Sequence, residues 1–131
     1  MSKENVDLAH RSIDAMNRRD LDAYLALMDE DVEAVSRIVA VEGGMHGHDG
    51  IRRWWESWFD VFPDYKVEIV ETRDHGDLVL GALRALGHGA GSDLPFEDTV
   101  WNASRWQRGK CVWWQIFSTE KEALEAAGFS E

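Results

Sequence analysis

The sequence predicts an α+β fold built on an antiparallel sheet. Two observations carry this prediction: apolar residues recur at steps of three and four in the first half of the chain, and at steps of two in most of the second half. The expected order is two helices, a strand, a helix, four strands and a last helix. Helices that gather early and strands that gather late are typical of α+β domains rather than of βαβ units.

The N-terminal part predicts two helices and a strand. A first apolar stripe places a helix at about residues 4–17, and Asp20 is a suitable N-cap for a second, shorter helix. The buried faces of the two helices are expected to be Val6, Ala9, Ile13 and Met16, and then Leu21, Tyr24, Leu25 and Met28. A β-branched segment at 32–41 predicts the first strand, with residues 42–44 (EGG) as its turn.

The third helix has the clearest pattern in the chain. Six large apolar residues lie at helical spacing: Ile51, Trp54, Trp55, Trp58, Phe59 and Phe62. Asp49 is the expected N-cap, and Pro63 ends the helix because its ring excludes the α conformation for the preceding residue. Strands then follow at 65–72, 78–86, 96–106 and 111–117. Thr119 opens a capping box with Glu122, and the last helix reaches Gly128 as its C′ residue.

Charge and composition restrict the partners. The 131 residues fit one domain, 1–131, and carry 14 Lys and Arg against 25 Asp and Glu, a formal net charge of −11. Such a surface repels phosphate backbones and anionic headgroups, so we expect neither nucleic acid nor a membrane as partner. The single cysteine, Cys111, excludes an internal disulfide. No apolar run approaches the ~20 residues of a spanning helix. We expect a cytoplasmic protein without a cofactor.

Five short segments, in this order, are typical of one known superfamily. They are 15–23 (AMNRRDLDA), 46–51 (HGHDGI), 62–64 (FPD), 108–110 (RGK) and 122–128 (EALEAAG). The chain resembles the nuclear transport factor 2-like superfamily over nearly its whole length, specifically the SnoaL-like small-molecule branch. The resemblance implies a cone-shaped, strongly bent antiparallel sheet that is wrapped around the N-terminal helices and encloses an apolar pocket. It also implies that the outer sheet face often pairs two subunits.

The resemblance shows where related enzymes keep their reactive groups. Ketosteroid isomerase relatives use a first-strand aspartate as the base, with a first-helix tyrosine and a later-strand aspartate as enolate stabilisers. The matching positions here are Ser36, Ser12 and Asn102, none of which can shuttle a proton near pH 7. Polyketide cyclases of the SnoaL type place their acid/base aspartate where Asn102 stands. An amide can orient a carbonyl but cannot act as the base.

Asp98 and Asn102 are the candidate catalytic pair. They lie four residues apart, so on an extended strand they share one face. If that face is concave, Asp98 is the carboxylate best placed to enter the pocket, where desolvation by aromatic rings would suit it to acid/base work. The alternative is a solvated carboxylate near the start of its strand.

Three further residues are candidate ligand contacts. His46, with His48, forms a His-x-His pair beside Asp49, but no further ligand stands at metal-site spacing, so we expect no metal. His46 is instead a titrating group for the pocket mouth. His88 lies in a glycine-rich loop that is either a lid or an ordinary hairpin connection. Arg84 is either an anion anchor in the pocket or half of an ion pair between subunits.

The seven tryptophans divide into two sets. We expect the pocket walls to be Tyr24, Trp55, Trp58 and Phe59. Trp113 and Trp114 are adjacent on a strand and point to opposite faces, while Trp101 has the opposite parity to Asn102. An aromatic outer face is prone to aggregation unless another chain covers it, which predicts a homodimer through that face.

Two functions follow from these residues. The first is an enzyme of the isomerase, cyclase, lyase or hydrolase type, which acts on an apolar substrate that bears a carbonyl or an epoxide, with Asp98 as the acid/base and Asn102 as the orienting amide. The second is a pocket that binds a hydrophobic metabolite without turnover, or a dimerisation module. An apolar cavity serves both uses equally.

Overall fold

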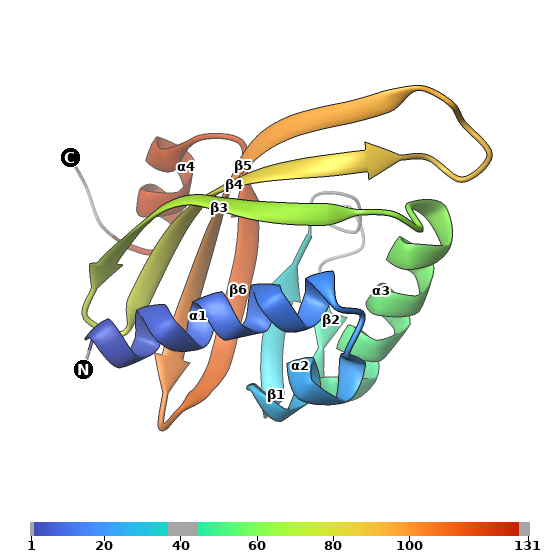
Figure 1. Ribbon diagram of the computed structural model, residues 1–131. Coiled ribbons are helices and arrows are strands. Elements are labelled where there is room, and N and C mark those ends of the chain that lie inside the picture. Colours follow the sequence, from blue (N-terminus) through green and yellow to red (C-terminus); the bar gives the residue numbers. More distant parts are fainter. Residues whose placement is uncertain (1, 37–44, 129–131) are drawn as a thin grey trace.

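The computed structural model describes residues 2–36 and 45–128 and confirms the predicted α+β class. Its helices are α1 (Ser2–Asn17), α2 (Leu21–Ala26), α3 (Gly47–Val61) and α4 (Glu120–Ala126). Its strands are β1 (Met28–Val35), β2 (Met45–His46), β3 (Lys66–His75), β4 (Leu78–His88), β5 (Pro95–Gln107) and β6 (Lys110–Phe117). The sheet curls around one side of the molecule without closing (Figure 1).

The six strands form one sheet in the order β2-β1-β6-β5-β4-β3. Every neighbouring pair is antiparallel except β1 and β6, which run parallel. The sheet is therefore mixed, where the sequence predicted an antiparallel one. A parallel pair needs a long crossover, and α3 with strands β2 to β5 supplies it. Register shifts within β3 and before Trp106 in β5 mark irregularities of the kind that bend strands.

The concave face of the sheet carries the main core. Figure 1 shows α1 lying across the open side of the sheet, with α2 and α3 near one end. The buried side chains of this core come from α1, α2, α3 and the inward residues of the strands, and include Val32, Ile51, Leu83 and Trp114. This arrangement leaves room between the helices and the sheet.

The convex face has a smaller core of its own. Leu78, Leu80 and Ala103 are fully buried there, because Ala123 of α4 and Ala127, the C-cap of that helix, pack onto them. The Thr119 half of the predicted capping box is present, since its side chain accepts a hydrogen bond from the Glu122 amide, 3.2 Å away. Among the described residues, the Glu122 side chain makes no reciprocal bond to the Thr119 amide. Gly128, at φ +92°, follows as the C′ residue. The last helix therefore covers part of the outer sheet face.

Near the first strand, one local prediction is confirmed and another is wrong. The Asp20 cap of α2 is confirmed, since its side chain accepts from the Ala23 amide. The helix, however, stops at Ala26, and Met28 already belongs to β1, which ends at Val35. Met28 would be buried whether it ended the helix or began the strand, so its apolar character could not show to which element it belongs. The rest of the expected strand, to residue 41, and the turn at 42–44 lie outside the described residues.

The start of α3 also differs from the prediction. The helix begins at Gly47 with His46 as N-cap and without a side-chain cap, and Asp49 lies in its first turn. Gly47 adopts φ +70°, which lets the chain turn from the short β2 directly into the helix. Its end is as predicted, with Phe62 as C-cap before Pro63.

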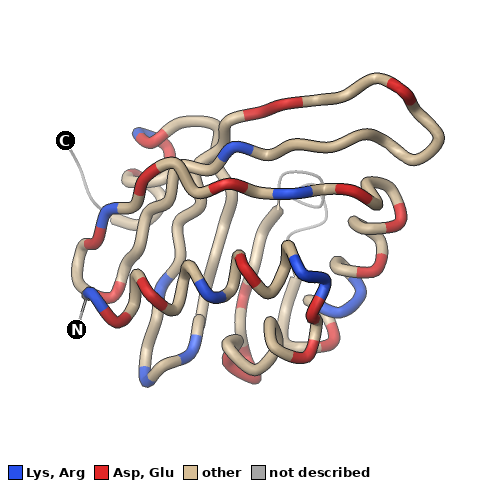
Figure 2. Tube along the Cα trace, in the orientation of Figure 1, with Lys and Arg blue, Asp and Glu red and all other residues tan. Residues whose placement is uncertain are grey.

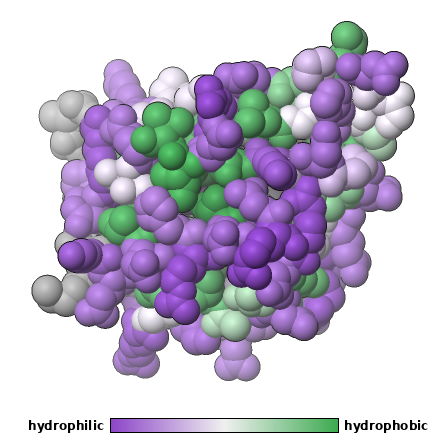
Figure 3. Space-filling view, viewed as in Figure 1, coloured by the Kyte–Doolittle hydropathy of each residue, from purple (hydrophilic) through white to green (hydrophobic). Residues whose placement is uncertain are grey.

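The surface is acidic and polar over most of its area. Figure 2 shows Asp and Glu on helices, strands and turns, with Lys and Arg interspersed among them. A hydrophobic side chain protrudes at the tip of the β4–β5 hairpin (Figure 3), where Leu94 is 78% exposed. Across the two described stretches, every helix lacks either the length or the apolar character needed to cross a membrane.

Candidate functional site

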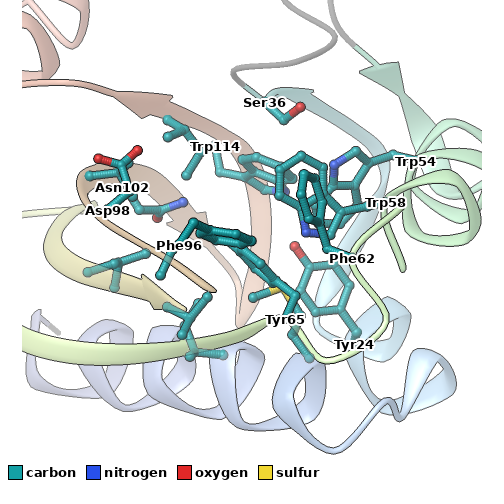
Figure 4. A pocket seen from close by; sticks show the side chains of 17 residues that line it. Tyr24, Ser36, Trp54, Trp58, Phe62, Tyr65, Phe96, Asp98, Asn102 and Trp114 are labelled. Carbon is teal, nitrogen blue, oxygen red and sulfur yellow. The ribbon is translucent and has the colours of Figure 1, made fainter. Parts of the chain in front are cut away.

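A pocket of ≈ 590 Å³ lies between the helices and the concave face of the sheet. Its walls are mostly aromatic and aliphatic, with few polar groups (Figure 4). Apolar clefts of this size with a few oriented polar groups are the usual form of small-molecule sites. The 17 lining residues are Ile13, Met16, Tyr24, Ser36, Trp54, Trp58, Phe62, Tyr65, Val67, Leu83, Ala85, Phe96, Asp98, Val100, Asn102, Trp114 and Ile116.

One end of this pocket is a continuous aromatic wall. Trp58 contacts Phe62 and Tyr65 with ring centroids 4.9 and 5.0 Å apart. Trp54 meets Trp114 edge to face at 5.2 Å. Offset and edge-to-face pairs at these distances are favourable for aromatic rings. The wall therefore offers a ligand a set of preformed ring faces and edges.

The aromatic wall carries several hydrogen-bond donors. Burial raises the pKa of the Tyr24 hydroxyl far above its ordinary value, and the nearby Cys111 thiol acts in the same direction, so Tyr24 stays neutral. The indole N–H groups of Trp54, Trp58 and Trp114 are buried without a hydrogen-bond acceptor among the residues that the structure describes. The indole N–H of Trp114 lies near the Tyr24 hydroxyl and partly opposes the rise in its pKa. The two groups do not, however, meet the geometry of a hydrogen bond.

The opposite side of the pocket carries Asp98 and Asn102. Both project from β5 toward the cavity, and Ser36, at the end of β1, lies apart from them in Figure 4. Asp98 pairs in register with Ala85, and Asn102 with Gly81 on one side and Ile116 on the other. Asp98 is exposed, so solvent reaches its carboxylate, and the desolvation expected from the sequence is absent. Asn102 is half-buried, and its amide makes no hydrogen bond to the described residues.

Of the four aromatic residues expected to line the pocket, two do so and two do not. Tyr24 and Trp58 line the pocket, whereas Trp55 and Phe59 do not. Trp54 and Trp58 share one face of α3, and Trp55, one step further round, packs into the core against Tyr24 at 5.2 Å. Phe59 lies under the guanidinium of Arg19, 3.9 Å from the ring centroid. Apolar periodicity identified the helix but not which of its two aromatic rows meets the cavity.

His46, His88 and Arg84 lie outside the lining of the pocket. His46 and Arg84 are exposed, and His88 is half-buried. Each is paired with a carboxylate: His46 with Glu33, His88 with Asp64 at 2.7 Å, and Arg84 with Glu68 at 2.6 Å. Arg84 alternates with the inward-facing Leu83 and Ala85, which directs it to the other face of β4. Its partner carboxylate is in the same chain.

These pairs shift the pKa of their members in the directions expected of ion pairs. The hydrogen bond to Glu33 raises the pKa of His46, and the hydrogen bond from His88 lowers the pKa of Asp64. The neighbouring His48 has its Nε2 2.9 Å from the Met28 carbonyl oxygen, which joins the start of α3 to β1. Within the described part of the chain, no three acidic, His or Cys side chains gather as a metal ion requires.

A second, smaller chamber of ≈ 40 Å³ adjoins the pocket. Five residues line both cavities: Ile13, Tyr24, Leu83, Asn102 and Trp114. Ser12 and Ser104 belong to the chamber alone, and both are more than nine-tenths buried. The sequence positions matched to reactive groups of relatives, Ser12, Ser36 and Asn102, thus all line one cavity or the other. The chamber itself left no signal in the sequence pattern, because α1 and the sheet form it jointly.

Comparison with known proteins identifies the family. The model of the SnoaL-like domain matches residues 9–114. No functionally curated protein matches the chain. Similar solved structures include an uncharacterized cystatin-fold protein from Novosphingobium aromaticivorans, with 26% identity, TM-score 0.72, and coverage of 89% of this chain and 98% of that one. IdmH, a candidate polyketide cyclase from Streptomyces antibioticus, has 24% identity, TM-score 0.76, and coverage of 95% and 98%.

A third structure extends the likeness in fold. It is an NTF2-like protein of unknown function from Burkholderia pseudomallei, with 17% identity, TM-score 0.79, and coverage of 93% of this chain and 95% of that one. The match to the family model begins within α1 and ends within β6, and it includes every residue that lines the pocket except Ile116. The chain belongs to the family of SnoaL-like domains.

Proposed function

We propose that this protein is an enzyme that acts on an apolar small molecule bearing a carbonyl or an epoxide. The observation that carries the proposal is the position of Asp98 and Asn102 on one face of β5, at the wall of an aromatic pocket of ≈ 590 Å³. The aromatic wall holds the apolar body of the substrate by burial. The polar pair meets its reactive end.

The two polar residues take different roles. The amide of Asn102 donates a hydrogen bond to the carbonyl or epoxide oxygen and so orients the substrate. The Asp98 carboxylate accepts a proton from the carbon or hydroxyl beside that oxygen and returns it later in the reaction. This sequence of proton transfers corresponds to an isomerase, a cyclase or a lyase.

A second function, binding without turnover, has its own supporting observation. Ser36 and Ser12 occupy cavity positions where ketosteroid isomerase relatives carry a carboxylate and a phenol. A serine hydroxyl does not ionise near pH 7, so neither serine replaces the carboxylate or phenol as a general acid or base. In this alternative, Asp98 and Asn102 only bind the polar end of a hydrophobic metabolite.

Ligand discovery and turnover together decide between the two functions. A thermal-shift screen of apolar ketones, lactones, epoxides and steroids finds compounds that raise the melting temperature, because a ligand that binds only the folded state stabilises it by mass action. Each hit is then assayed for conversion with wild type, Asp98→Asn and a matched surface control, Asp60→Asn. Loss of conversion only in Asp98→Asn, with affinity retained, supports catalysis, and conversion that survives Asp98→Asn contradicts it.

We propose a homodimer through the convex face of the sheet. Trp101 and Trp113 are only partly buried against the small outer core, because α4 covers only part of this face. A second copy would cover the remaining aromatic surface. Light scattering after size exclusion should give twice the mass of the 131-residue chain at micromolar concentration. A monomer under these conditions would contradict the proposal.

A further inference from the structure

The small chamber beside the pocket is lined by a glycine, Gly81, at a strand position where most residues would place a side chain. Thr72 of β3, Gly81 of β4 and Asn102 of β5 lie opposite one another across three neighbouring strands. All three line the chamber. Gly81 is the one member of this row without a side chain, and the chamber occupies the space above it.

Gly81 is not required by the backbone. A Cβ atom built there would meet only the Leu83 Cδ2 atom, at 3.6 Å, which is an ordinary van der Waals distance. Its φ is not in the left-handed region that favours glycine. Glycine inside a strand weakens the strand, and its presence marks a bulge or a close approach by another group. Since Gly81 pairs regularly with both neighbours, close approach is the remaining reason.

The walls of the chamber offer hydrogen bonds of both kinds. Ser12 Oγ donates to the Ala9 carbonyl oxygen at 2.7 Å, which leaves its lone pairs as acceptors. Ser104 Oγ accepts from Trp106 Nε1 at 2.8 Å, which leaves its hydroxyl hydrogen as a donor. Asn102 adds an amide at the boundary with the main pocket. A group that both donates and accepts suits this set best.

We propose that the chamber is a subsite for one hydroxyl-sized polar substituent of the ligand, and that Gly81 limits the size of that substituent. The volume of ≈ 40 Å³ accommodates such a group but not a branched alkyl group. This inference rests on the proposed function of the main pocket, because the apolar body of the same ligand lies there. It adds a chemical class: apolar compounds that carry a hydroxyl-sized polar group at one edge.

Three naphthalene probes test the subsite: naphthalene, 2-naphthol and 2-isopropoxynaphthalene. Their dissociation constants are measured through probe fluorescence with wild type, Gly81→Ala and Gly81→Val. We expect wild type to bind 2-naphthol about two- to tenfold more tightly than naphthalene, the range of one net hydrogen bond, and the isopropoxy compound most weakly. Gly81→Ala should reduce the preference for 2-naphthol, and Gly81→Val should abolish it while leaving naphthalene binding unchanged.

Ala85→Val is the matched control. Ala85 lies on the same face of β4 and lines the main pocket but not the chamber. It should weaken naphthalene and 2-naphthol equally and leave their ratio unchanged. If wild type does not prefer 2-naphthol over naphthalene, or if this preference survives in Gly81→Val, the subsite proposal is overturned. The proposed function of the main pocket is unaffected by either result. If no probe binds wild type, the apolar pocket fails as a ligand site, and the subsite fails with it.

Discussion

The two faces of the sheet use the same residue types for different purposes. On the convex face, Leu78 and Leu80 are completely buried under α4. On the concave face, Leu83 and Trp114 are also nearly inaccessible, yet both line cavities. The convex face is a closed core, and the concave face is a core with space left inside it. Burial alone therefore does not distinguish a packing residue from a ligand contact.

The open volume on the concave face, which the convex core lacks, is typical of a ligand site. A folded protein normally fills its interior to nearly crystalline density, and a cavity that is left open forfeits packing energy. Among the described residues, the indole N–H groups and the amide that border the open volume have no hydrogen-bond partner. A buried polar group without a partner is costly in a purely structural core. A ligand in this space, as we propose, would supply those partners.

The largest expected contrast is in stability, between two leucines of β4. Leu80→Ala on the convex face should lower the free energy of unfolding by about 2–5 kcal/mol, as deletion from a filled core does. Leu83→Ala on the concave face should cost less, because one side of Leu83 already faces open space. Urea denaturation of both variants measures the difference. Equal losses would mean that the cavity wall is packed as tightly as the convex core.

The next contrast separates two tryptophans of α3. Trp58→Leu should weaken binding of 1-tetralone, a bicyclic aromatic ketone, by about threefold to tenfold, the worth of one aromatic contact. Trp55→Leu is the matched control: it should lower stability but leave affinity unchanged, since Trp55 is buried outside the pocket. Calorimetric titration of both variants gives the two affinities. A weakened affinity in Trp55→Leu alone would place the ligand elsewhere.

A smaller effect is expected from the cap of α4, which covers the convex face. Thr119→Ala removes the acceptor for the Glu122 amide and should cost about 1 kcal/mol of stability. Thr119→Ser keeps the hydroxyl and is the control. Chemical denaturation checks both. Neither variant should change ligand affinity, and a change would couple the two faces in a way that the structure does not suggest.

The smallest effect concerns the exposed ion pair between Glu33 of β1 and His46 of β2, the strand at one edge of the sheet. Glu33 raises the pKa of His46 above its ordinary value of 6.5. A raised pKa in the folded state means that the pair stabilises the fold fully below that ordinary value and loses its effect as pH rises through the folded value. NMR titration of His46 should show a fall in its pKa in Glu33→Gln. An unchanged pKa would show that the exposed pair does not form in solution.

The sequence predicted most of the fold because its elements carry local signals. Residues close in sequence determine three of these features: the tryptophan-rich helix α3, its end before Pro63, and the Thr119 cap of α4. The parallel pairing of β1 with β6 depends on contacts between distant segments, and no local pattern encodes it. Met28 shows the limit, since an apolar residue between a helix and a strand fits either element.

The site was predictable only in part, for the same reason. Alternation along β5 placed Asp98 and Asn102 on one face, and the structure has both on the pocket wall. Which row of α3 meets the cavity depends on how the helix is rotated against the sheet, and so Trp54 was missed and Trp55 was included. His46, His88 and Arg84 have partners from segments 13 to 24 residues away, and chemistry alone suggested the pocket for them.

Blocking the pocket tests the central claim most directly. Ala85→Phe places a ring in the open volume beside Asp98, at a position where the cavity has room for it. Calorimetric titration with 1-tetralone compares this variant with wild type, and circular dichroism confirms that both are folded. We predict binding to wild type and no detectable heat of binding in the folded variant. Binding of equal strength to both proteins, or none to wild type, would contradict the account.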